Sequence, residues 1–581
     1  MPWPYHFVDL SDEQLKQRRR LLDSYGQFAQ LSVLLLPLIY QLSLGIKLLS
    51  RRFATKKGYQ PLKENQSPIP PRLREHTPSD SRNIWRRLSW WLDEPIARGW
   101  ETRWECLLAA LWAGWLLFLV IKNTGDDYLH MTKRFGIIAA SQLPIHYLLA
   151  AKAWSPIQYL TRMSHEELNP YHRLLGRIIV TFFACHATLY LNFFVQKGLL
   201  SKRIRDWDVI LGICAISSAI LLFTTALARI RDYNYRIFFY AHVALASMLL
   251  PILYFHVSHL RIYILESAAI FAVIIVQRNV YQTTLSATIT RIPKTNLLSV
   301  SIPLGKSSIS IDNLKAGQHI YFGSPSLVKK LVKNPFTIAN TPTRSKNYIR
   351  LIVRSLGGPT ASLDALASSS QQITITIEGP YGATAHFPDL SSFDRILLVA
   401  GGVGATFIMP IYSQLKTSMG QEKLNFVWVV RDLADTSWVD DELVEEDGED
   451  GDRWNEGVHG EAQIYVTGAS RASGRSAERG RLLGNREDDD AVGADADGFE
   501  LQDVGKPRSE GENTRSRSSR VREGRPDLRA VVDDIFEHDP TDRVAVLVCG
   551  PANMGTALRK EVGRWVAGGR DVFWHNEQFE W

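Results

Sequence analysis

Four histidines in the first half of the chain recur with one spacing. His172 and His186 lie 14 residues apart in one apolar segment, and His242 and His256 lie 14 residues apart in another. At about 100° and 1.5 Å per residue, 14 helical residues make four turns less about 40° and rise roughly 21 Å. Each helix would therefore present two imidazoles on one face, one toward each end.

Two parallel helices of this kind would set His172 level with His242, and His186 level with His256. Two facing imidazoles at each level can supply both axial ligands of a haem, because imidazole nitrogen is a good ligand for haem iron. The alternative is a set of polar residues that hydrogen-bond across helices. The repeated interval favours haem, since polar residues at membrane depth are costly and usually functional. Other histidines lack such a partner and are interpreted as packing or interfacial residues: His130, His146, His165 and His259.

The elements that would position these histidines are membrane spans. A hydrocarbon core about 30 Å thick takes about 20 helical residues. Seven stretches are long enough, the third and seventh being short and interrupted: 28–49, 104–121, 135–151, 174–195, 209–228, 237–256 and 260–276. The fourth and sixth carry the histidines and are separated by one return span, so we expect them to run parallel.

Charge predicts how the spans are oriented. The basic segment 51–103 and the loop 229–236 are expected in the cytoplasm, and the acidic loop 122–132 outside. Seven spans then put the N-terminus outside and the C-terminal half in the cytoplasm. The loop 196–208 disagrees, because its basic residues would face outside; they are Lys197, Lys202, Arg203 and Arg205.

Composition excludes several classes of protein. The 581 residues carry a net charge of +7 and 22% charged residues, and cytoplasmic loops of a membrane protein explain the excess of Lys and Arg better than nucleic-acid binding does. Four cysteines exclude a disulfide scaffold, and we expect no cleaved signal peptide. A transporter is disfavoured because no internal repeat is evident.

The second half of the chain changes pattern near residue 281. Short alternating runs punctuated by Gly and Pro predict a small antiparallel barrel. Within it, Asn334–Ile338 reads NPFTI, which a proline-led strand start would also explain. The segment Gly357–Thr360 opens a short helical pattern, where free backbone N–H groups can hold a phosphate. Glu378–Gly382 (EGPYG) is a turn that closes the barrel.

A nucleotide-binding pattern follows the barrel. A buried strand (395–400), a glycine turn (GGVGAT, 401–406) and a helix (407–415) stand in the order that a phosphate site needs. The glycines that would let the backbone approach a pyrophosphate are Gly401, Gly402 and Gly404. Arg431, just past the next strand, suits the 2′-phosphate of NADPH, with a surface ion pair as the alternative. The last strand brings Cys549, Gly550 and Pro551 to the same sheet edge, where a nicotinamide could lie.

An insert of about 90 residues, 434–522, interrupts this unit. It is rich in charged and small residues and contains few apolar ones apart from GEAQIYVTGA. Such a composition cannot bury a core, so we expect it to be mostly disordered. A linker is the default interpretation, and a loop controlled by phosphorylation is the alternative.

With the paired histidines, NPFT, EGPYG, GGVGAT and CGP in this order, the chain resembles the fungal ferric-chelate reductases. These belong to the superfamily that also contains the NADPH oxidases, and the resemblance runs from the second span to the last residue. It implies a multi-domain membrane protein: an α-helical transmembrane bundle of about seven spans, an antiparallel β-barrel FAD domain and an α/β NADPH-binding domain, ferredoxin-reductase-like. The implied units are 1–103 (first span and basic linker), 104–280 (haem-binding spans), 281–390 (FAD barrel) and 391–581 (NADPH domain).

The resemblance also implies site residues. His172 with His242 would ligate the inner haem b, and His186 with His256 the outer one. The FAD contacts would be Pro335, Phe336, Thr337, Arg354, Gly358, Thr360 and Trp581. The NADPH contacts would be Gly401, Gly402, Gly404, Arg431, Cys549, Gly550 and Pro551. Asn334 replaces the histidine of the family's HPFT motif, and Gly524–Pro526 resembles a further segment on the nucleotide side. The ring of Trp581 would cover the flavin, although an unpacked tail residue is the alternative.

The function that the resemblance implies is transmembrane electron transfer without a general acid or base. Electrons would pass from cytosolic NADPH through FAD and two haems to an extracytoplasmic ferric chelate or Cu²⁺, serving iron uptake at the plasma membrane rather than the vacuolar one. The alternatives are an NADPH oxidase that reduces oxygen to superoxide and a haem-binding redox sensor without turnover. The expected partners are the lipid bilayer, the external acceptor, and an iron permease or oxidase, with no nucleic acid. The basic loop 196–208 would attract anionic chelates by charge.

Overall fold

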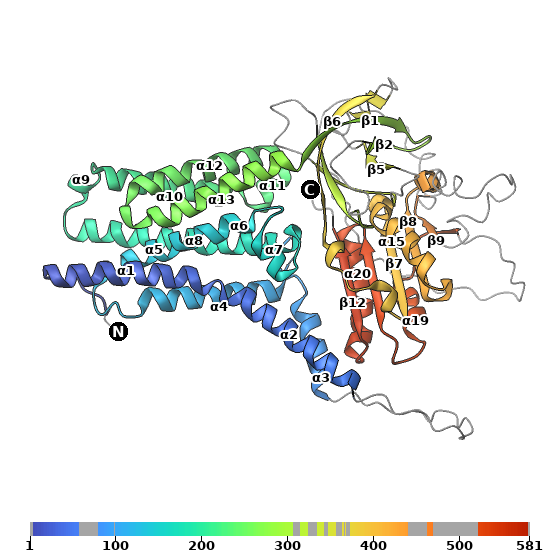
Figure 1. The fold of residues 1–581 in the computed structure, drawn as a ribbon, viewed down its shortest axis with the longest axis horizontal. Coiled ribbons are helices and arrows are strands. Elements are labelled where there is room, and N and C mark those ends of the chain that lie inside the picture. The colour runs from blue at the N-terminus through green and yellow to red at the C-terminus, as the bar shows by residue number, and fades with distance from the viewer. Residues whose placement is uncertain are drawn as a thin grey trace, which may run out of the picture.

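The computed structural model of the chain describes most of its residues. They are 4–56, 80–97, 99–305, 314–323, 334–341, 347–355, 363–364, 366–367, 372–439, 462–468 and 521–578. They form an elongated helical bundle at one end of the molecule and two six-stranded sheets at the other (Figure 1).

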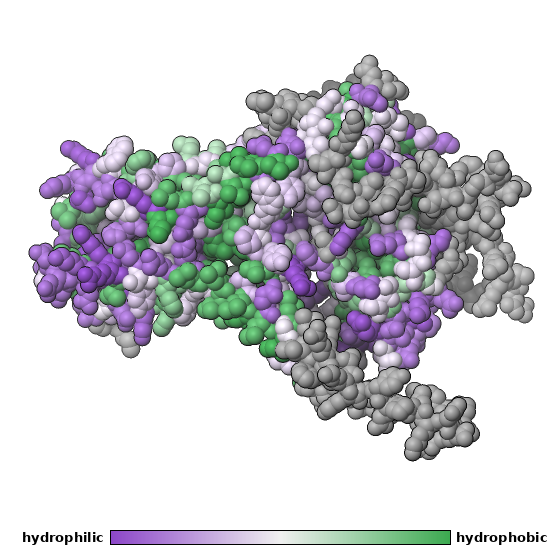
Figure 2. All heavy atoms as spheres, in the orientation of Figure 1, coloured by the Kyte–Doolittle hydropathy of each residue, from purple (hydrophilic) through white to green (hydrophobic). Residues whose placement is uncertain are grey.

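Six helical stretches in the described residues are long and apolar enough to cross a membrane. The first joins α1 (Asp12–Ser32) to part of α2 (Leu35–Lys56). The others are formed by α4 (Arg103–Ile121), α8 (His165–Gln196), α10 (Trp207–Thr225), α12 (Tyr235–His256) and α13 (Arg261–Val280). Hydrophobic residues gather on the outside of this bundle, and hydrophilic ones cover its far end (Figure 2). The chain is therefore an integral, multi-pass membrane protein.

The predicted third span differs from the others because it is broken. It consists of α5 (Tyr128–Ser141) and α6 (Leu143–Leu149), which meet at Gln142. Pro144 stands at the start of α6, where its missing N–H and fixed φ suit the first turn of a new helix but would interrupt a continuous one. The seven predicted spans are thus six helical stretches of sufficient length and one pair of shorter helices.

Polar side chains cap the starts of several helices. The side chains of Ser11, Thr102 and Ser164 each accept a hydrogen bond from the backbone N–H of the third helical residue. The side chain of that third residue accepts one in turn from the backbone N–H of the cap. Glu101, one residue before the α4 cap, is buried and binds Arg173 and Arg177 of α8. Burial alone would raise the pKa of the Glu101 carboxyl, but a backbone hydrogen bond and the two guanidinium groups outweigh burial and lower it. These contacts fix the start of α4 against α8.

The loops gather at the two ends of the bundle. The N-terminal segment, the start of α5 and α9 (Leu200–Arg203) lie at the end away from the sheets, whereas α7 (Pro156–Thr161) and α11 (Ala228–Tyr233) lie at the end beside them (Figure 1). His6 donates its backbone N–H to Asp126, and Arg18 pairs with Asp127 at 2.9 Å. Segments predicted to lie outside therefore share one end, and those predicted to be cytoplasmic share the other.

An antiparallel barrel follows α13. Its strands are β1 (Gln282–Arg291), β2 (Leu297–Pro303), β3 (His319–Gly323), β4 (Asn334–Thr337), β5 (Tyr348–Arg354) and β6 (Ile373–Tyr381), in the order β4-β3-β6-β1-β2-β5. A bridge between Ile338 and Leu351 and a hydrogen bond from Ala339 to Arg350 bring the two edge strands together. The sheet is nearly closed, as the alternating pattern predicted.

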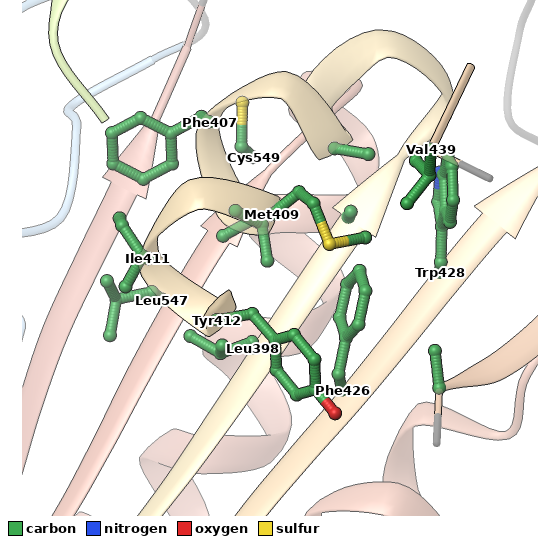
Figure 3. Close-up of a cluster of buried hydrophobic side chains, with 14 of the residues drawn as sticks. Leu398, Phe407, Met409, Ile411, Tyr412, Phe426, Trp428, Val439, Leu547 and Cys549 are labelled. Atoms are coloured by element: carbon green, nitrogen blue, oxygen red, sulfur yellow. The ribbon is translucent and has the colours of Figure 1, made fainter. Parts of the chain in front are cut away.

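The last unit is a parallel sheet in the order β10-β9-β8-β7-β11-β12. Its strands are β7 (Arg395–Gly401), β8 (Leu424–Val430), β9 (Gln463–Val466), β10 (Val521–Glu523), β11 (Val544–Cys549) and β12 (Val572–Glu577). Residues of α15 (Ala405–Ser418) pack on one face of the sheet (Figure 3), and α19 (Leu528–Phe536) and α20 (Ala552–Ala567) pack on the other. Both faces are covered, which explains the continuous apolar runs of β7 and β11. The predicted fold class is confirmed.

The insert is where the structure departs from the prediction. We expected 434–522 to be mostly disordered, but Gln463–Val466 within it forms β9, paired in parallel with β8 and β10. Trp438 and Val439 are also buried in the core of this unit. β9 comes from GEAQIYVTGA, the apolar run noted in the sequence, and the strands on either side of it stabilise these four residues. The residues 440–461 and 469–520 lie outside the described part of the chain.

Candidate functional site

The four spaced histidines lie on α8 and α12, as the spacing predicted. The rings of His172 and His242 face each other, with centroids 6.3 Å apart and planes inclined by 64°. His186 on α8 and His256 on α12 stand at the other level of the same two helices. The structure thus brings the residues together in the predicted pairs, and their role as haem ligands stays a prediction.

Backbone carbonyls orient three of these imidazoles. Nδ1 of His172 lies 3.0 Å from the carbonyl oxygen of His146, Nδ1 of His186 lies 2.8 Å from that of Thr132, and Nδ1 of His256 lies 2.7 Å from that of Asp208. A carbonyl oxygen only accepts, so Nδ1 must carry the proton and donate. The lone pair of each ring then sits on Nε2, which is how a histidine is prepared to ligate a metal.

The fourth imidazole differs from these three. Nδ1 of His242 is buried and has no hydrogen-bond partner among the described residues. A buried polar atom without a partner is costly, and a bound group that fixes the ring through Nε2 would be one reason to retain a histidine there. The donor set of the four histidines therefore fits two bis-histidine haems.

Glycines make room for the rings between the helices. A Cβ atom at Gly136 of α5 would lie 2.9 Å from the imidazole of His186, and one at Gly212 of α10 would lie 2.9 Å from that of His256. Both values are shorter than real Cβ contacts, so these positions admit no side chain without movement. Small residues allow close approach at helix interfaces in membranes, and here they admit the imidazoles.

His146 was interpreted as a packing residue, but the structure places it against the His172–His242 level. Its ring stacks on that of His172 with centroids 4.0 Å apart, and its Nε2 lies 3.1 Å from the carbonyl oxygen of His172. His146 lies on α6, in the broken span, so it has no part in the 14-residue spacing. No sequence signal could have found it.

Four of the predicted flavin residues are described, on the two edge strands β4 and β5 of the barrel. Pro335, Phe336 and Thr337 form β4 and pair with β3, and Phe336 packs edge-on against Phe322. Asn334, which replaces the family's histidine, pairs with Phe322 in the same ladder. The other predicted flavin contacts apart from Arg354 lie outside the described residues: Gly358, Thr360 and Trp581.

Arg354 stands where the barrel meets the parallel sheet. It ends β5, and a Cβ atom at Gly402 would lie 3.4 Å from its Nη2. Its Nη2 lies 3.7 Å from the carboxylate of Asp435, whereas its Nε is buried and has no hydrogen-bond partner in the described part of the chain. Burial raises the pKa of Asp435, against the lowering effect of Arg354. A cation with an unsatisfied buried donor beside a glycine turn fits a phosphate group.

The two predicted nucleotide turns interlock. β7 and β11 are neighbours, so the turn Gly401–Gly404 and the turn Cys549–Pro551 leave the sheet side by side. A Cβ atom at Gly404 would lie 2.2 Å from the carbonyl oxygen of Cys549, and one at Gly401 would lie 2.7 Å from the ring of Pro551. Burial raises the pKa of the Cys549 thiol, which therefore stays protonated.

Further residues follow the other strands at the same edge. The carbonyl oxygen of Arg431, just past β8, accepts a hydrogen bond from Gly468, which follows β9. Gly524, with φ +94°, follows β10 and donates to Val466. Because these strands are parallel, their carboxyl ends share one edge, which is where α/β sheets bind nucleotides. The predicted NADPH residues are thus gathered at one edge.

The barrel contacts the membrane domain through a buried charged cluster that the sequence did not predict. Nε2 of His319 on β3 lies 3.2 Å from a carboxylate oxygen of Glu166 on α8. The ammonium group of Lys152 lies 3.2 Å from the ring centre of Tyr321, and 3.9 Å from the carboxylate of Glu378. Burial raises the pKa of Tyr321. This cluster joins the flavin-side barrel to the helix that carries His172.

Three family profiles match consecutive parts of the chain. "Ferric reductase like transmembrane component" matches residues 135–253, "FAD-binding domain" matches 281–385, and "Ferric reductase NAD binding domain" matches 393–563. The three matches follow the bundle, the barrel and the parallel sheet in order.

Individual proteins resemble the chain over different lengths. The probable metalloreductase AIM14 of Scheffersomyces stipitis is 21% identical over 85% of this chain and 89% of its own. A probable ferric reductase transmembrane component of Eremothecium gossypii is 25% identical over 53% of this chain and 48% of its own. Among solved structures, flavohemoglobin from Malassezia yamatoensis aligns with 76% of this chain and 96% of its own, at 13% identity and a TM-score of 0.33.

Proposed function

The chain belongs to the ferric reductase family, and on that premise we propose that it carries electrons from cytosolic NADPH, through FAD and two b-type haems, to an extracytoplasmic ferric chelate. Transmembrane electron transfer and metal reduction follow from the family and its FAD- and NAD-binding domains. Four points are parts of the proposal: the choice of NADPH, the number of haems, the ferric chelate as acceptor, and a role in iron uptake at the plasma membrane.

The observation that carries the proposal is the orientation of the histidines. Three of the four rings are held at Nδ1 by backbone carbonyls, which leaves Nε2 as the metal-binding atom. One level lies toward each end of the α8 and α12 pair. Two imidazoles at each level would hold one haem, which would supply one-electron transfer. An external acceptor would then be reduced without binding to the haem iron.

The soluble half supports the donor side of the same path. A flavin supplies the step between a two-electron hydride donor and one-electron acceptors. The glycine turn and Arg431 would hold the nucleotide at the carboxyl edge of the parallel sheet, and Arg354 would hold a flavin phosphate beside Gly402. Glu166 and His319 hold the barrel against α8. No side chain needs to act as a general acid or base.

The charge at the far end of the bundle supports the part of the proposal that concerns an anionic acceptor. The basic loop 196–208 lies at the end away from the two sheets (Figure 1). Arg203 pairs with Asp206 and lies 3.4 Å from Asp208, so its charge is offset within the loop. Lys202 and Arg205 then carry the proposed attraction for ferric chelates. An iron permease or oxidase as partner stays a prediction.

The test is an anaerobic difference spectrum of membranes with NADPH as the only reductant. We expect a six-coordinate b-type haem signal that appears with NADPH and collapses when ferric citrate is added. His256→Leu should lower the haem content, whereas the matched control His259→Leu should not, because His259 binds Asp23 rather than facing the other rings. The FAD content should be equal in both variants.

Other outcomes would change the assignment. A haem signal that is reoxidised only by oxygen would replace the proposal with an NADPH oxidase. A haem that NADPH never reduces, in protein with bound flavin, would favour a redox sensor without turnover. Absence of haem from well-expressed protein would mean that the four histidines are structural.

A further inference from the structure

The helix α3 (Asp80–Leu92) lies between two membrane spans of the chain. It follows α2, which ends at Lys56, and ten residues separate it from α4, which begins at Arg103. In Figure 1 it stands at the sheet-side end of the bundle, below α2 and close to the parallel-sheet domain. From its sequence, this segment was predicted to be part of a basic cytoplasmic linker.

One face of α3 is docked on α20 of the nucleotide domain. The indole of Trp90 meets that of Trp574 edge-on, with ring centres 5.7 Å apart, and a Cβ atom at Gly563 would lie 2.8 Å from its Nε1. Arg559 of α20 lies 4.2 Å from the centre of the Trp90 ring and donates to the Trp90 carbonyl at 2.8 Å. Burial lowers the pKa of Arg559.

Two arginines of α3 extend this docking to the C-terminal end of α20. Arg87 donates to the carbonyl of Ala567 at 2.8 Å, and Arg86 donates to that of Gly569. Cations at a helix C-terminus satisfy its free carbonyls and suit its dipole. Asn83, Arg86, Arg87 and Trp90 follow the helical spacing, and at 100° per residue they occupy an arc of about 100°.

The opposite face of α3 is apolar and largely exposed. Ile84 is 62% exposed, Trp85 70%, Leu88 39% and Trp91 52%. At 100° per residue, these side chains occupy an arc of about 120° that does not overlap the docked face. The guanidinium of Arg103, at the start of α4, lies 4.6 Å from the centre of the Trp91 ring, but about half of Trp91 and most of Trp85 stay exposed. Four large apolar residues on one side of a short helix form a contact surface rather than scattered exposure.

The lipid bilayer that the chain itself spans is the occupant that the structure favours. The apolar surface continues through the short connection to α4, where Ile96 and Trp100 are exposed, and onto the exposed Trp104 and Leu107 of α4. Trp is enriched at the level of lipid headgroups. The segment is also basic, and cationic amphipathic helices lie in the interface of anionic membranes.

We propose that α3 lies in the headgroup region of the bilayer, with Trp85, Leu88 and Trp91 inserted toward the acyl chains and Trp90 bound to the nucleotide domain. The helix then holds α20 at a fixed height above the membrane. Only the membrane embedding of the chain is needed for this inference, which is independent of the electron donor and acceptor.

Site-specific photocrosslinking in the full-length protein tests the proposal. The photoreactive residue p-benzoylphenylalanine replaces Trp85 in one variant and Ser89 in the control, since Ser89 is also exposed but lies to the side of the apolar face. Both variants are reconstituted in nanodiscs of phosphatidylcholine and phosphatidylserine, irradiated and analysed by mass spectrometry. We expect at least about five times more lipid adduct at position 85 than at 89. If the Trp85 variant is not produced, the probe at Leu88 gives the same comparison.

Three results would overturn the proposal. Adducts from position 85 to another segment of the same chain would show an internal partner, and adducts to a second copy would show a dimer interface. Equal lipid labelling at positions 85 and 89 would show that the apolar face has no preferred contact with lipid.

Discussion

Gly404 lies at the point where the two nucleotide turns meet, and replacing it with Ala should disturb both. A Cβ atom there would lie 2.2 Å from the carbonyl oxygen and 2.6 Å from the carbonyl carbon of Cys549. To reach ordinary contact at 3.4 Å, this oxygen would have to retreat by about 1.2 Å. It cannot do so freely, because Cys549 ends β11, which is paired with β7 on one side and β12 on the other.

The size of the effect follows from the cost of overpacking. Forcing one extra carbon into a tightly packed site typically costs about 1–3 kcal/mol. If the protein relieves the clash by parting the two turns, this cost corresponds to a factor of about 5 to 150 in the population of the native arrangement. Since both turns belong to the proposed nucleotide edge, the KM for NADPH should rise by that factor in Gly404→Ala.

The assay is the NADPH-driven reduction of flavin in the purified full-length protein. Gly420→Ala is the matched control, because it lies in the same domain and a Cβ atom there meets nothing within 4 Å. The haem and flavin spectra should be unchanged in both variants. A folded Gly404→Ala protein whose KM for NADPH is within twofold of the Gly420→Ala value would refute the reasoning.

Four further predictions follow from other parts of the chain. Glu101→Gln should destabilise the bundle by about 1–3 kcal/mol at pH 7, because it leaves two arginines of α8 without their buried carboxylate partner. The pKa of Glu101 is lowered in the folded protein, so the stabilisation by its carboxylate is present above the usual pKa of a carboxyl. This stabilisation is lost as the pH falls through the lowered pKa. Arg431→Ala should raise the KM for NADPH about 10- to 150-fold and leave that for NADH unchanged. Changing Lys202 and Arg205 to Gln should raise the KM for ferric citrate about 3- to 10-fold at low salt, and less at high salt. Trp90→Ala should speed amide exchange in α20, because it removes the ring that Arg559 and Trp574 contact.

Each of these predictions has an opposing result. If the Glu101→Gln variant loses its haem absorption on heating at the same temperature as the wild type, the predicted destabilisation is wrong. An equal change in the KM for NADPH and NADH would assign Arg431 to a surface ion pair. A KM for ferric citrate that does not depend on salt or on the two loop charges would remove the loop from acceptor binding. Unchanged exchange in α20 would mean that α3 contributes nothing to its stability.

Local periodicity is the part of this protein that its sequence determined. The 14-residue interval places His172 and His186 on one helix face because the turn of an α-helix is constant, whatever surrounds it. The length of a span follows in the same way from the thickness of the bilayer. Strand, glycine turn and helix in succession predicted the nucleotide edge, since Gly401–Gly404 directly follows β7.

Contacts between segments distant in the sequence were decided by the tertiary structure alone. The stacking of His146 on His172 depends on how the broken span packs against α8. The clash that forbids a side chain at Gly404 depends on β11, far along the chain. The strand at Gln463–Val466 exists because β8 and β10 lie on either side of it. The docking of Trp90 on α20 joins residues more than 450 positions apart. A sequence pattern reports the period of one element, whereas these features depend on which surfaces meet when all the elements pack together.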